Sequence, residues 1–280
     1  MKNLFAFDIG NETEHPECEE WSKLVIRRTE DELSEKQDEL SENLEEHKKN
    51  AELPSWLTIA RSLCLLFFLI VLSATAKAGF GTAMRNAPGL VISGAVSGAA
   101  ALVLWLIGRS KAKNVIESED FNADVAEAEK INAESLASLG VPEDAAEVDV
   151  FTYFYELKNG KEKRKGIISD YMTMQFRAFR EGEMLCLADV GGVIGIPIYN
   201  ITGIHKINKR VSFMEWNKEE AFNKGEYKQY KMTSNNMGAI FIKPYYSLRF
   251  CDCGEEYEIL FPAYELETFK RLTGAGVKEE

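Results

Sequence analysis

The chain has 280 residues, with 33 Lys and Arg against 45 Asp and Glu, and its formal net charge is −12. This acidic balance argues against nucleic acid as the main partner, because phosphate binding needs a basic surface. The charges are unevenly spread: residues 54–108 carry three basic side chains and no acidic ones, whereas residues 1–53 carry seven basic and 16 acidic side chains. A stretch so poor in charge is long enough to cross a bilayer, which argues against a purely soluble protein.

The acidic head, residues 1–53, is predicted to be helical or disordered. From Ile26 onward, apolar residues recur at Leu33, Leu40 and Leu44, with Glu and Lys between them. The repeat is too short for a coiled coil, which needs three or four heptads. We therefore expect a solvated helix that leads toward the first apolar segment. The alternative is a segment that folds when it recruits a partner.

Two apolar segments, residues 54–76 and 88–108, are predicted to be transmembrane helices joined by a short loop at 77–87. The first includes Arg61 near its start, where a guanidinium can reach the membrane interface. The second carries no charge. A membrane span needs about 20 residues, so both segments qualify. The alternative is a buried helical hairpin of a large soluble domain, but the remaining chain is small for enclosing two such helices.

Basic residues around these segments predict their orientation. Arg109, Lys111 and Lys113 follow the second segment, whereas the loop holds only Lys77 and Arg85. Because basic residues accumulate on the cytoplasmic side, we expect a multi-pass protein of the cell membrane with both termini in the cytoplasm. Neither segment is interpreted as a signal peptide, since an acidic head precedes the first apolar run.

Gly94 and Gly98 lie four residues apart in the second segment and form a GxxxG face. Such a face lets two helix backbones approach closely. We expect it to pack on the first segment of the same chain, with a homodimer as the alternative. Neither segment carries Asp, Glu, His or Asn in its middle, and ion pathways usually need such groups. The pair is therefore predicted to be an anchor rather than a transporter.

Beyond the apolar segments, the pattern changes twice. Residues 109–146 are rich in Ala and Glu, and their apolar spacing predicts a helical stalk. From residue 147 onward, short β-rich runs alternate with turns, and residues 262–273 form an amphipathic pattern typical of a closing helix. Residues 211–225 are expected to form a long loop. The expected strands cover residues 148–157, 171–179, 184–188, 193–199, 204–207, 229–233, 239–242, 246–250 and 257–261.

Short antiparallel strands followed by one amphipathic helix resemble the pleckstrin-homology-like (PH-like) barrel. The residues that carry the resemblance are the Asn159-Gly160 hairpin and the stretches 196–207, 239–250 and 258–272. The chain looks most like the bacterial membrane-tethered PH-like (YcxB-like) proteins, in which such a domain is attached to two transmembrane helices. The resemblance implies an α+β membrane protein: a two-helix transmembrane hairpin, a C-terminal PH-like β-barrel capped by an α-helix at 147–274, and a tail at 275–280. Another small β-barrel or an α+β sandwich is the alternative.

Five basic residues gather around one predicted hairpin: Lys158, Lys161, Lys163, Arg164 and Lys165. In lipid-binding members of the resembled family, basic residues of the first hairpin hold phosphoinositide headgroups, so the resemblance implies a site for anionic lipid. Near an anionic membrane each Lys or Arg contributes about 1 kcal/mol. The alternative is an ordinary solvated turn, with the domain acting through a protein partner.

No motif predicts catalysis, a metal site or a cofactor. Cys251 and Cys253 flank a predicted turn, but a structural zinc needs four ligands and no second pair is evident, so we interpret them as reduced thiols. His205 has no nucleophile or carboxylate that a motif would place beside it. The glycines at 191–195 lack the spacing of a dinucleotide site. The sequence thus predicts a non-enzymatic membrane protein that binds protein or anionic lipid; the alternative is a signalling or envelope-stress component that acts through its acidic head.

Overall fold

The computed structural model describes residues 1–9, 24–158, 161–165, 169–214, 225–230, 232–234 and 238–279. The chain divides into two compact units, which we name the sheet unit (Met1–Glu30 and Glu134–Glu280) and the helical unit (Asp31–Ala133). The protein is therefore a mixed α+β chain that contains a large sheet and two long apolar helices.

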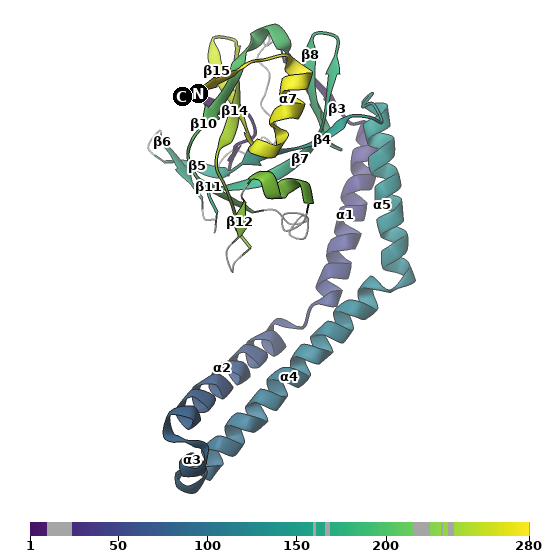
Figure 1. Ribbon diagram of the computed structural model, residues 1–280. Coiled ribbons are helices and arrows are strands. Elements are labelled where there is room, and N and C mark those ends of the chain that lie inside the picture. The colour runs from purple at the N-terminus through teal and green to yellow at the C-terminus, as the bar shows by residue number, and fades with distance from the viewer. Residues whose placement is uncertain are drawn as a thin grey trace. The chain divides into compact units, whose positions relative to one another are not determined.

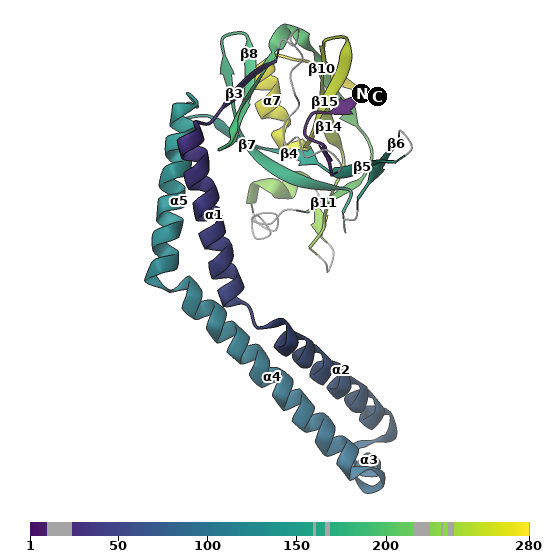
Figure 2. The same cartoon turned by 180° about the vertical axis from the view of Figure 1, so that it is seen from behind.

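The helical unit is an extended hairpin of helices. Its elements are α1 (Asp31–Ala51), α2 (Ser55–Ala78), the short α3 (Phe80–Asn86), α4 (Pro88–Ile116) and α5 (Glu119–Ser138), whose last turn belongs to the sheet unit. Figures 1 and 2 show α2 beside α4, and α1 beside α5. Pro88 opens α4, at a position where a missing amide N–H costs no helical hydrogen bond.

The prediction of two long apolar helices is confirmed, although their ends differ from those expected. α4 continues beyond residue 108 to Ile116. Arg109, Lys111 and Lys113 end the apolar stretch without ending the helix, because Arg and Lys are good helix formers. The loop predicted at 77–87 is largely helical, since it contains the end of α2 and all of α3.

Thirteen of the described strands form one hydrogen-bonded sheet, and three form a smaller one. The larger sheet contains two antiparallel meanders that follow each other along the chain. The first comprises β4 (Ala146–Thr152), β7 (Tyr171–Glu181), β8 (Met184–Ala188) and β9 (Gly192–Pro197), and the second comprises β10 (Ile201–Ile207), β14 (Tyr245–Asp252) and β15 (Glu255–Pro262). Leu260 of β15 pairs with Phe151 of β4 and joins the two meanders.

Short strands and short 3-10 helices complete the described part of the sheet unit. In the larger sheet, β1 (Lys2–Asn3) pairs with β15, β3 (Val25–Arg28) with β9, β11 (Val211–Met214) with β7 and β13 (Ile240–Ile242), β12 (Thr233–Ser234) with β13, and β16 (Val277–Glu279) with β10. The smaller sheet consists of β2 (Phe7–Asp8), β5 (Phe154–Lys158) and β6 (Lys161–Arg164). The 3-10 helices are η1 (Ile198–Asn200), η2 (Gly225–Tyr230) and η3 (Ala263–Glu265).

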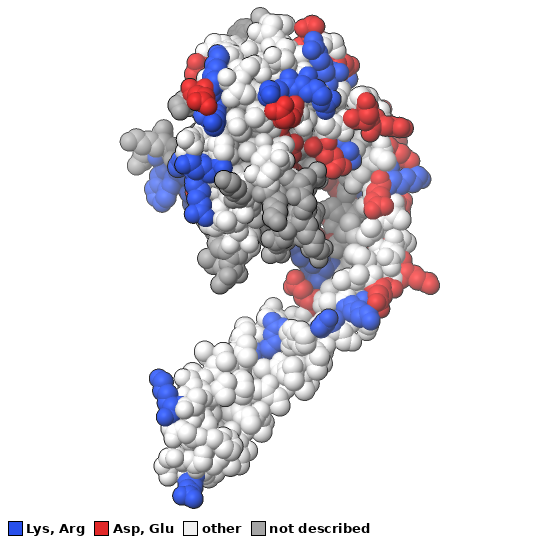
Figure 3. Space-filling model, in the orientation of Figure 1, with Lys and Arg blue, Asp and Glu red and all other residues white. Residues whose placement is uncertain are grey.

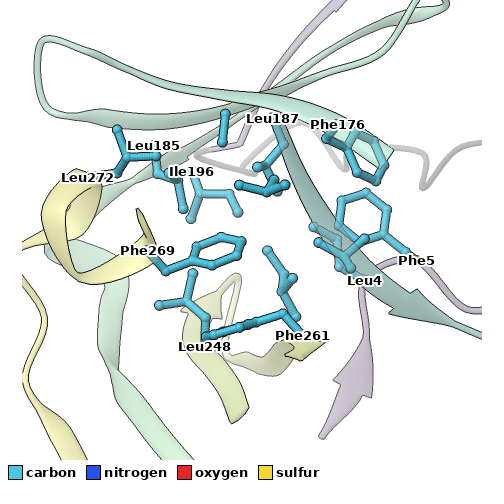
Figure 4. Packing of buried hydrophobic residues seen from close by; sticks show 14 of the residues in the cluster. Leu4, Phe5, Phe176, Leu185, Leu187, Ile196, Leu248, Phe261, Phe269 and Leu272 are labelled. Carbon is cyan, nitrogen blue, oxygen red and sulfur yellow. The ribbon is translucent and has the colours of Figure 1, made fainter. Parts of the chain in front are cut away.

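The main core is built from apolar side chains of both meanders and of α7 (Leu266–Thr273). Figure 4 shows Phe269 and Leu272 of α7 directed into the same cluster as Leu248 and Phe261. Phe269 is fully buried, and its ring stacks on Phe261 with centroids 4.3 Å apart. Among the described strands the pairing path ends at β12 and β16 without closing into a ring, so a barrel stays a prediction.

Several predicted boundaries in the sheet unit are wrong. The strand expected at 148–157 is interrupted at Tyr153, and its two halves, β4 and β5, belong to different sheets. The strand expected at 229–233 begins as part of η2, and the loop expected at 211–225 begins with β11. Residues 215–224 lie outside the described part of the chain. The expected tail at 275–280 contributes β16.

The first 30 residues belong to the sheet unit, whereas the sequence predicted a helical or disordered head through residue 53. Leu4 and Phe5 are buried in the main core, and the Phe5 ring packs on Phe176 with centroids 4.6 Å apart. The Asn3 amide nitrogen donates to the carbonyl oxygen of Phe151 at 3.3 Å. Only α1 matches the expected helix, because the strands before it depend on partners far away in the sequence.

Candidate functional site

The outward side chains of α2 and α4 are large, apolar and exposed. In the most apolar 18-residue window of each helix, only 6% of α2 and 11% of α4 is buried within the chain. Figure 3 shows this part of the helical unit as almost entirely uncharged. The core helix of a soluble domain would be mostly buried, so this surface fits lipid better than water. The exposed side chains include Ile59, Leu63, Leu66, Ile70, Ile92, Val96 and Leu102.

Small residues of α4 meet large residues of α2 where the two helices touch. A Cβ added at Gly94 would lie 2.6 Å from Val71 Cγ1, and one added at Gly98 would lie 2.7 Å from Phe68 Cδ2. A side chain larger than hydrogen at either position would therefore push the helices apart. The GxxxG face packs on α2 of the same chain, which is the closely approaching geometry that such a face permits.

Aromatic and basic side chains lie at the end of the apolar helices that joins α1 and α5. Trp56 is 68% exposed near the start of α2, and the Arg109 guanidinium lies 5.4 Å from the centre of the Trp105 ring. Lys111 Nζ donates to the carbonyl oxygen of Glu52 at 2.9 Å, which holds α4 against the junction of α1 and α2. Trp, Lys and Arg in such positions are typical of the boundary between hydrocarbon and headgroups.

The hairpin of β5 and β6 carries the predicted basic residues. Its register places Lys158 directly opposite Lys161, and Lys158 and Lys163 are both exposed. Lys158 and Lys163 therefore present positive charge to solvent on this hairpin. The Asn159-Gly160 turn and the side chain of Lys161 lie outside the described residues.

Lys165, directly after β6, forms an ion pair with Glu156 of β5. The hydrogen bond and the charge of Lys165 lower the pKa of the Glu156 carboxyl. Both side chains are nearly half exposed, so water and salt weaken what the pair contributes to stability. Glu156 also lies opposite Lys163 in the register and offsets part of the positive charge. Residues 156–165 together carry five basic and two acidic side chains.

The side chain of Arg164 packs on two tyrosine rings of the sheet unit. As the residue after Lys163 in a strand, it faces the other side of the hairpin. Its guanidinium lies 4.1 Å from the centre of the Tyr153 ring and 4.9 Å from that of Tyr171, and both tyrosines are buried. A cation over an aromatic ring contributes about 0.5–1 kcal/mol at an exposed site. The sequence counted Arg164 among the ligand-binding residues, and nothing in its local pattern indicates this contact.

Strand pairing places His205, for which the sequence offered no partner, beside polar residues that the sequence did not single out. His205 of β10 lies opposite Ser247 of β14, and Ser247 Oγ donates to Glu258 Oε2 at 2.7 Å. A nucleophilic serine would instead donate its proton to a histidine base. Ser247 is also fully buried, so a substrate has no access to it. The group therefore does not form a catalytic triad.

The three cysteines that the structure describes in the sheet unit occupy two environments. Cys251 and Cys253 are exposed beside the turn between β14 and β15, and Cys253 has a positive φ of 50°. Within the described residues, no group of three or more His, Cys, Asp or Glu side chains could hold a metal ion. Cys186 is buried, and this burial raises the pKa of its thiol to about 11. An unactivated thiol of this kind is a poor nucleophile.

Comparison of the chain with protein-family models, with curated proteins and with solved structures finds no match. We therefore infer its function from the surfaces described above: the apolar helices, their basic and aromatic ends, and the exposed lysines of the β5–β6 hairpin.

Proposed function

We propose that this chain is a non-enzymatic integral membrane protein whose sheet unit is a cytoplasmic PH-like domain that binds a protein or anionic lipid. The observation that carries the proposal is the exposed apolar surface of α2 and α4. Contiguous apolar surface of this extent is rare on soluble monomers, whereas in a bilayer it needs no protein cover.

The lengths and ends of the two helices support a transmembrane hairpin. α2 has 24 residues and is about 36 Å long at the α-helical rise, against a hydrocarbon thickness of about 30 Å. Arg109, Lys111 and Lys113 follow the apolar part of α4, whereas Lys77 and Arg85 stand alone near α3. This difference in basic residues favours a cytoplasmic position for α1, α5 and both termini.

The order of elements supports the PH-like assignment of the sheet unit. Two antiparallel meanders follow one another, and α7 then covers the core that they share, as a closing helix does in the resembled barrel. Lys158 and Lys163 give the β5–β6 hairpin an exposed positive surface. A surface of this kind fits a partner with negative charge, either a protein or the headgroups of the membrane that holds the helices.

The alternative is a signalling or envelope-stress component that acts through its acidic head. It draws support from α1, which carries eight acidic and three basic residues and exposes most of them. A partner of α1 would then be basic, whereas a partner of the β5–β6 hairpin would be acidic. The two functions are therefore distinguished by which segment loses binding when its charge is removed.

Cysteine labelling on intact cells tests the transmembrane arrangement. With the native cysteines replaced, Gly81→Cys in α3 and Gly276→Cys before β16 place thiols at positions where a Cβ meets no other atom within 4 Å. An impermeant maleimide should label Gly81→Cys on intact cells and Gly276→Cys only after permeabilisation. The reverse pattern would reject the orientation. Release of the chain by alkaline carbonate would reject the transmembrane hairpin itself.

A further inference from the structure

The sheet unit is joined to the rest of the chain through two connections, and both lie against the same three strands. The first connection is β3 with the residues that follow it, up to residue 30. The second is the end of α5 with the residues that lead to β4. Both contact the meander of β7, β8 and β9, although they are more than 100 residues apart in the sequence.

The first connection is fixed along the edge of β9. All four residues of β3 pair with β9 in antiparallel register, from Val25 with Gly195 to Arg28 with Gly192. The backbone approaches Gly192 so closely that an added Cβ would lie 2.5 Å from the carbonyl oxygen of Arg27. Thr29 extends the attachment, because its hydroxyl donates to the carbonyl oxygen of Val190 at 2.6 Å.

The second connection is held by apolar contacts with side chains of the same meander. Leu139 and Ala145 are buried in a small cluster with residues of β7, β8 and β9, and Val141 packs against it. Gly140, at φ +73°, gives α5 its left-handed end, and the amide of Val141 donates back to the carbonyl oxygen of Leu136 at 3.0 Å. The meander contributes Phe179, Cys186, Ala188 and Val193 to this cluster, and Met184 packs against it.

Arg27 links the two connections. Its Nη2 lies 2.6 Å from Glu181 Oε2 at the end of β7. Its Nη1 lies 3.8 Å from the point where a Cβ would stand on Gly140, two residues beyond the end of α5, so the guanidinium is next to that turn. A guanidinium at the carbonyl end of a helix is also favoured by the helix dipole. One side chain of β3 therefore forms an ion pair with the meander and lies beside the turn that follows α5.

We propose that β3, the end of α5 and the β7–β8–β9 meander form one clamp, in which the two connections dock and release together. Because Arg27 of β3 pairs with Glu181 of the meander and lies beside Gly140, the release of β3 removes a positive charge from the turn that follows α5. A displacement of either connection is thereby passed to the meander and to the other connection. The clamp is a conformational device, and it does not depend on which ligand the sheet unit binds.

Cys186 is a natural reporter for the state of the clamp. It pairs with Gly195 in the register, and a Cβ on Gly195 would lie 3.6 Å from its sulfur and 3.5 Å from Val25 Cβ of β3. Leu139 belongs to the same buried cluster. With a pKa of about 11, the thiol is almost entirely protonated at pH 8. Exposure to water would return its pKa toward the usual 8.5, which increases the reactive thiolate on the order of 100-fold.

The test uses the full chain in lipid nanodiscs with every cysteine except Cys186 replaced. Gly192→Val introduces a clash with the backbone of β3, and Arg27→Ala removes the shared side chain. Gly192→Val should raise the rate of Cys186 labelling at least about tenfold, since thiolate and access increase together. Arg27→Ala also removes a charge that lowers the pKa of Cys186, so labelling should rise by a smaller factor, through access alone. Arg180→Ala is the matched control, because Arg180 forms an ion pair with Glu183 beside the same hairpin but contacts neither connection in any described interaction. Its labelling rate should equal that of the parent.

Amide hydrogen exchange then decides whether the two connections are coupled. In both variants, exchange should accelerate at Val25–Arg28 and also at residues 139–141, while the amides of β14 and β15 stay protected and show that the sheet unit is folded. Acceleration at Val25–Arg28 alone would overturn the proposal, because the connections would then dock independently. Unchanged labelling of Cys186 in Gly192→Val would overturn it as well.

Discussion

His47 of α1 and Asp124 of α5 join the two polar helices of the helical unit: His47 Nε2 lies 3.0 Å from Asp124 Oδ2, and both side chains are only about a quarter exposed. The ring of Phe121 meets the His47 ring edge to face, with centroids 5.7 Å apart. α1 and α5 together carry 14 acidic and four basic residues, so the helices repel each other electrostatically. The contacts of His47 with Asp124 and Phe121 therefore hold α1 and α5 together against that repulsion.

Replacing His47 by Ala should loosen α1 from α5. The change removes a partly buried hydrogen bond and an aromatic contact, and we expect a loss of about 1 kcal/mol in the free energy of local opening. Amide exchange of α1 and α5 measures it, and lower salt should enlarge the effect because repulsion between the helices is less screened. Lys49→Ala is the control, since Lys49 pairs with Glu45 on the exposed surface of α1. Equal effects from the two variants would contradict a special role for His47.

The packing of α2 on α4 should require glycine at position 94 but not at position 89 of the same helix. Gly94→Ala places a methyl group against Val71, and overpacking of this kind costs about 1–3 kcal/mol. Gly89→Ala is the control, because a Cβ there meets nothing within 4 Å. Thermal unfolding of the full chain in detergent should show a lower midpoint for Gly94→Ala only. The double variant with Val71→Ala should recover part of the loss, and absence of recovery would assign the effect to another contact.

The apolar helices could be predicted from the sequence because each signal lies within one segment. A run without charge identifies a helix of the required length wherever the rest of the chain lies. The ends of the helices could not be predicted in the same way. Arg109 and Lys111 make this part of α4 polar, but they do not interrupt its helical backbone. A boundary drawn where the apolar residues stop therefore ends α4 too early.

The N-terminal strands could not be predicted, because their stability comes from residues distant in the sequence. β3 has only four residues, and it is a strand because β9 supplies its hydrogen bonds. Phe5 becomes a core residue only when Phe176 meets it. The same reason explains Arg164, which was predicted as part of a binding surface and whose contacts with Tyr153 and Tyr171 depend on tertiary structure.

Phe5→Ala tests the contribution of the N-terminus to the sheet unit. Phe5 is 7% exposed in the main core, and truncating a buried Phe typically costs about 3–5 kcal/mol. Urea unfolding of the full chain, followed by near-ultraviolet circular dichroism, should show a clearly lower midpoint. Ile9→Ala is the control, since Ile9 is 57% exposed. An unchanged midpoint for Phe5→Ala would mean that residues 147–280 fold without the N-terminal strands.

The last prediction concerns Lys158 and Lys163 on the β5–β6 hairpin, and it separates anionic lipid from protein as the ligand. A fluorophore at Leu157→Cys reports the hairpin, because Leu157 is 56% exposed and lies beside Lys158. The full chain, with its native cysteines replaced, is placed in nanodiscs that contain lipid with a quencher attached to the headgroup. Quenching then measures how close the hairpin comes to the bilayer surface.

If the hairpin meets anionic lipid, quenching should be stronger in nanodiscs with anionic phospholipid than in purely zwitterionic ones. High salt should abolish the difference, since the screening length falls from about 10 Å at 0.1 M to about 3 Å at 1 M. Lys158→Ser with Lys163→Ser should abolish it as well, because each lysine contributes about 1 kcal/mol near an anionic surface. Lys270→Ser on α7 is the control: Lys270 pairs with Glu267 and lies outside the hairpin. Quenching that is equal in both kinds of nanodisc would reject lipid as the ligand and leave an acidic protein surface as the partner that the lysines fit.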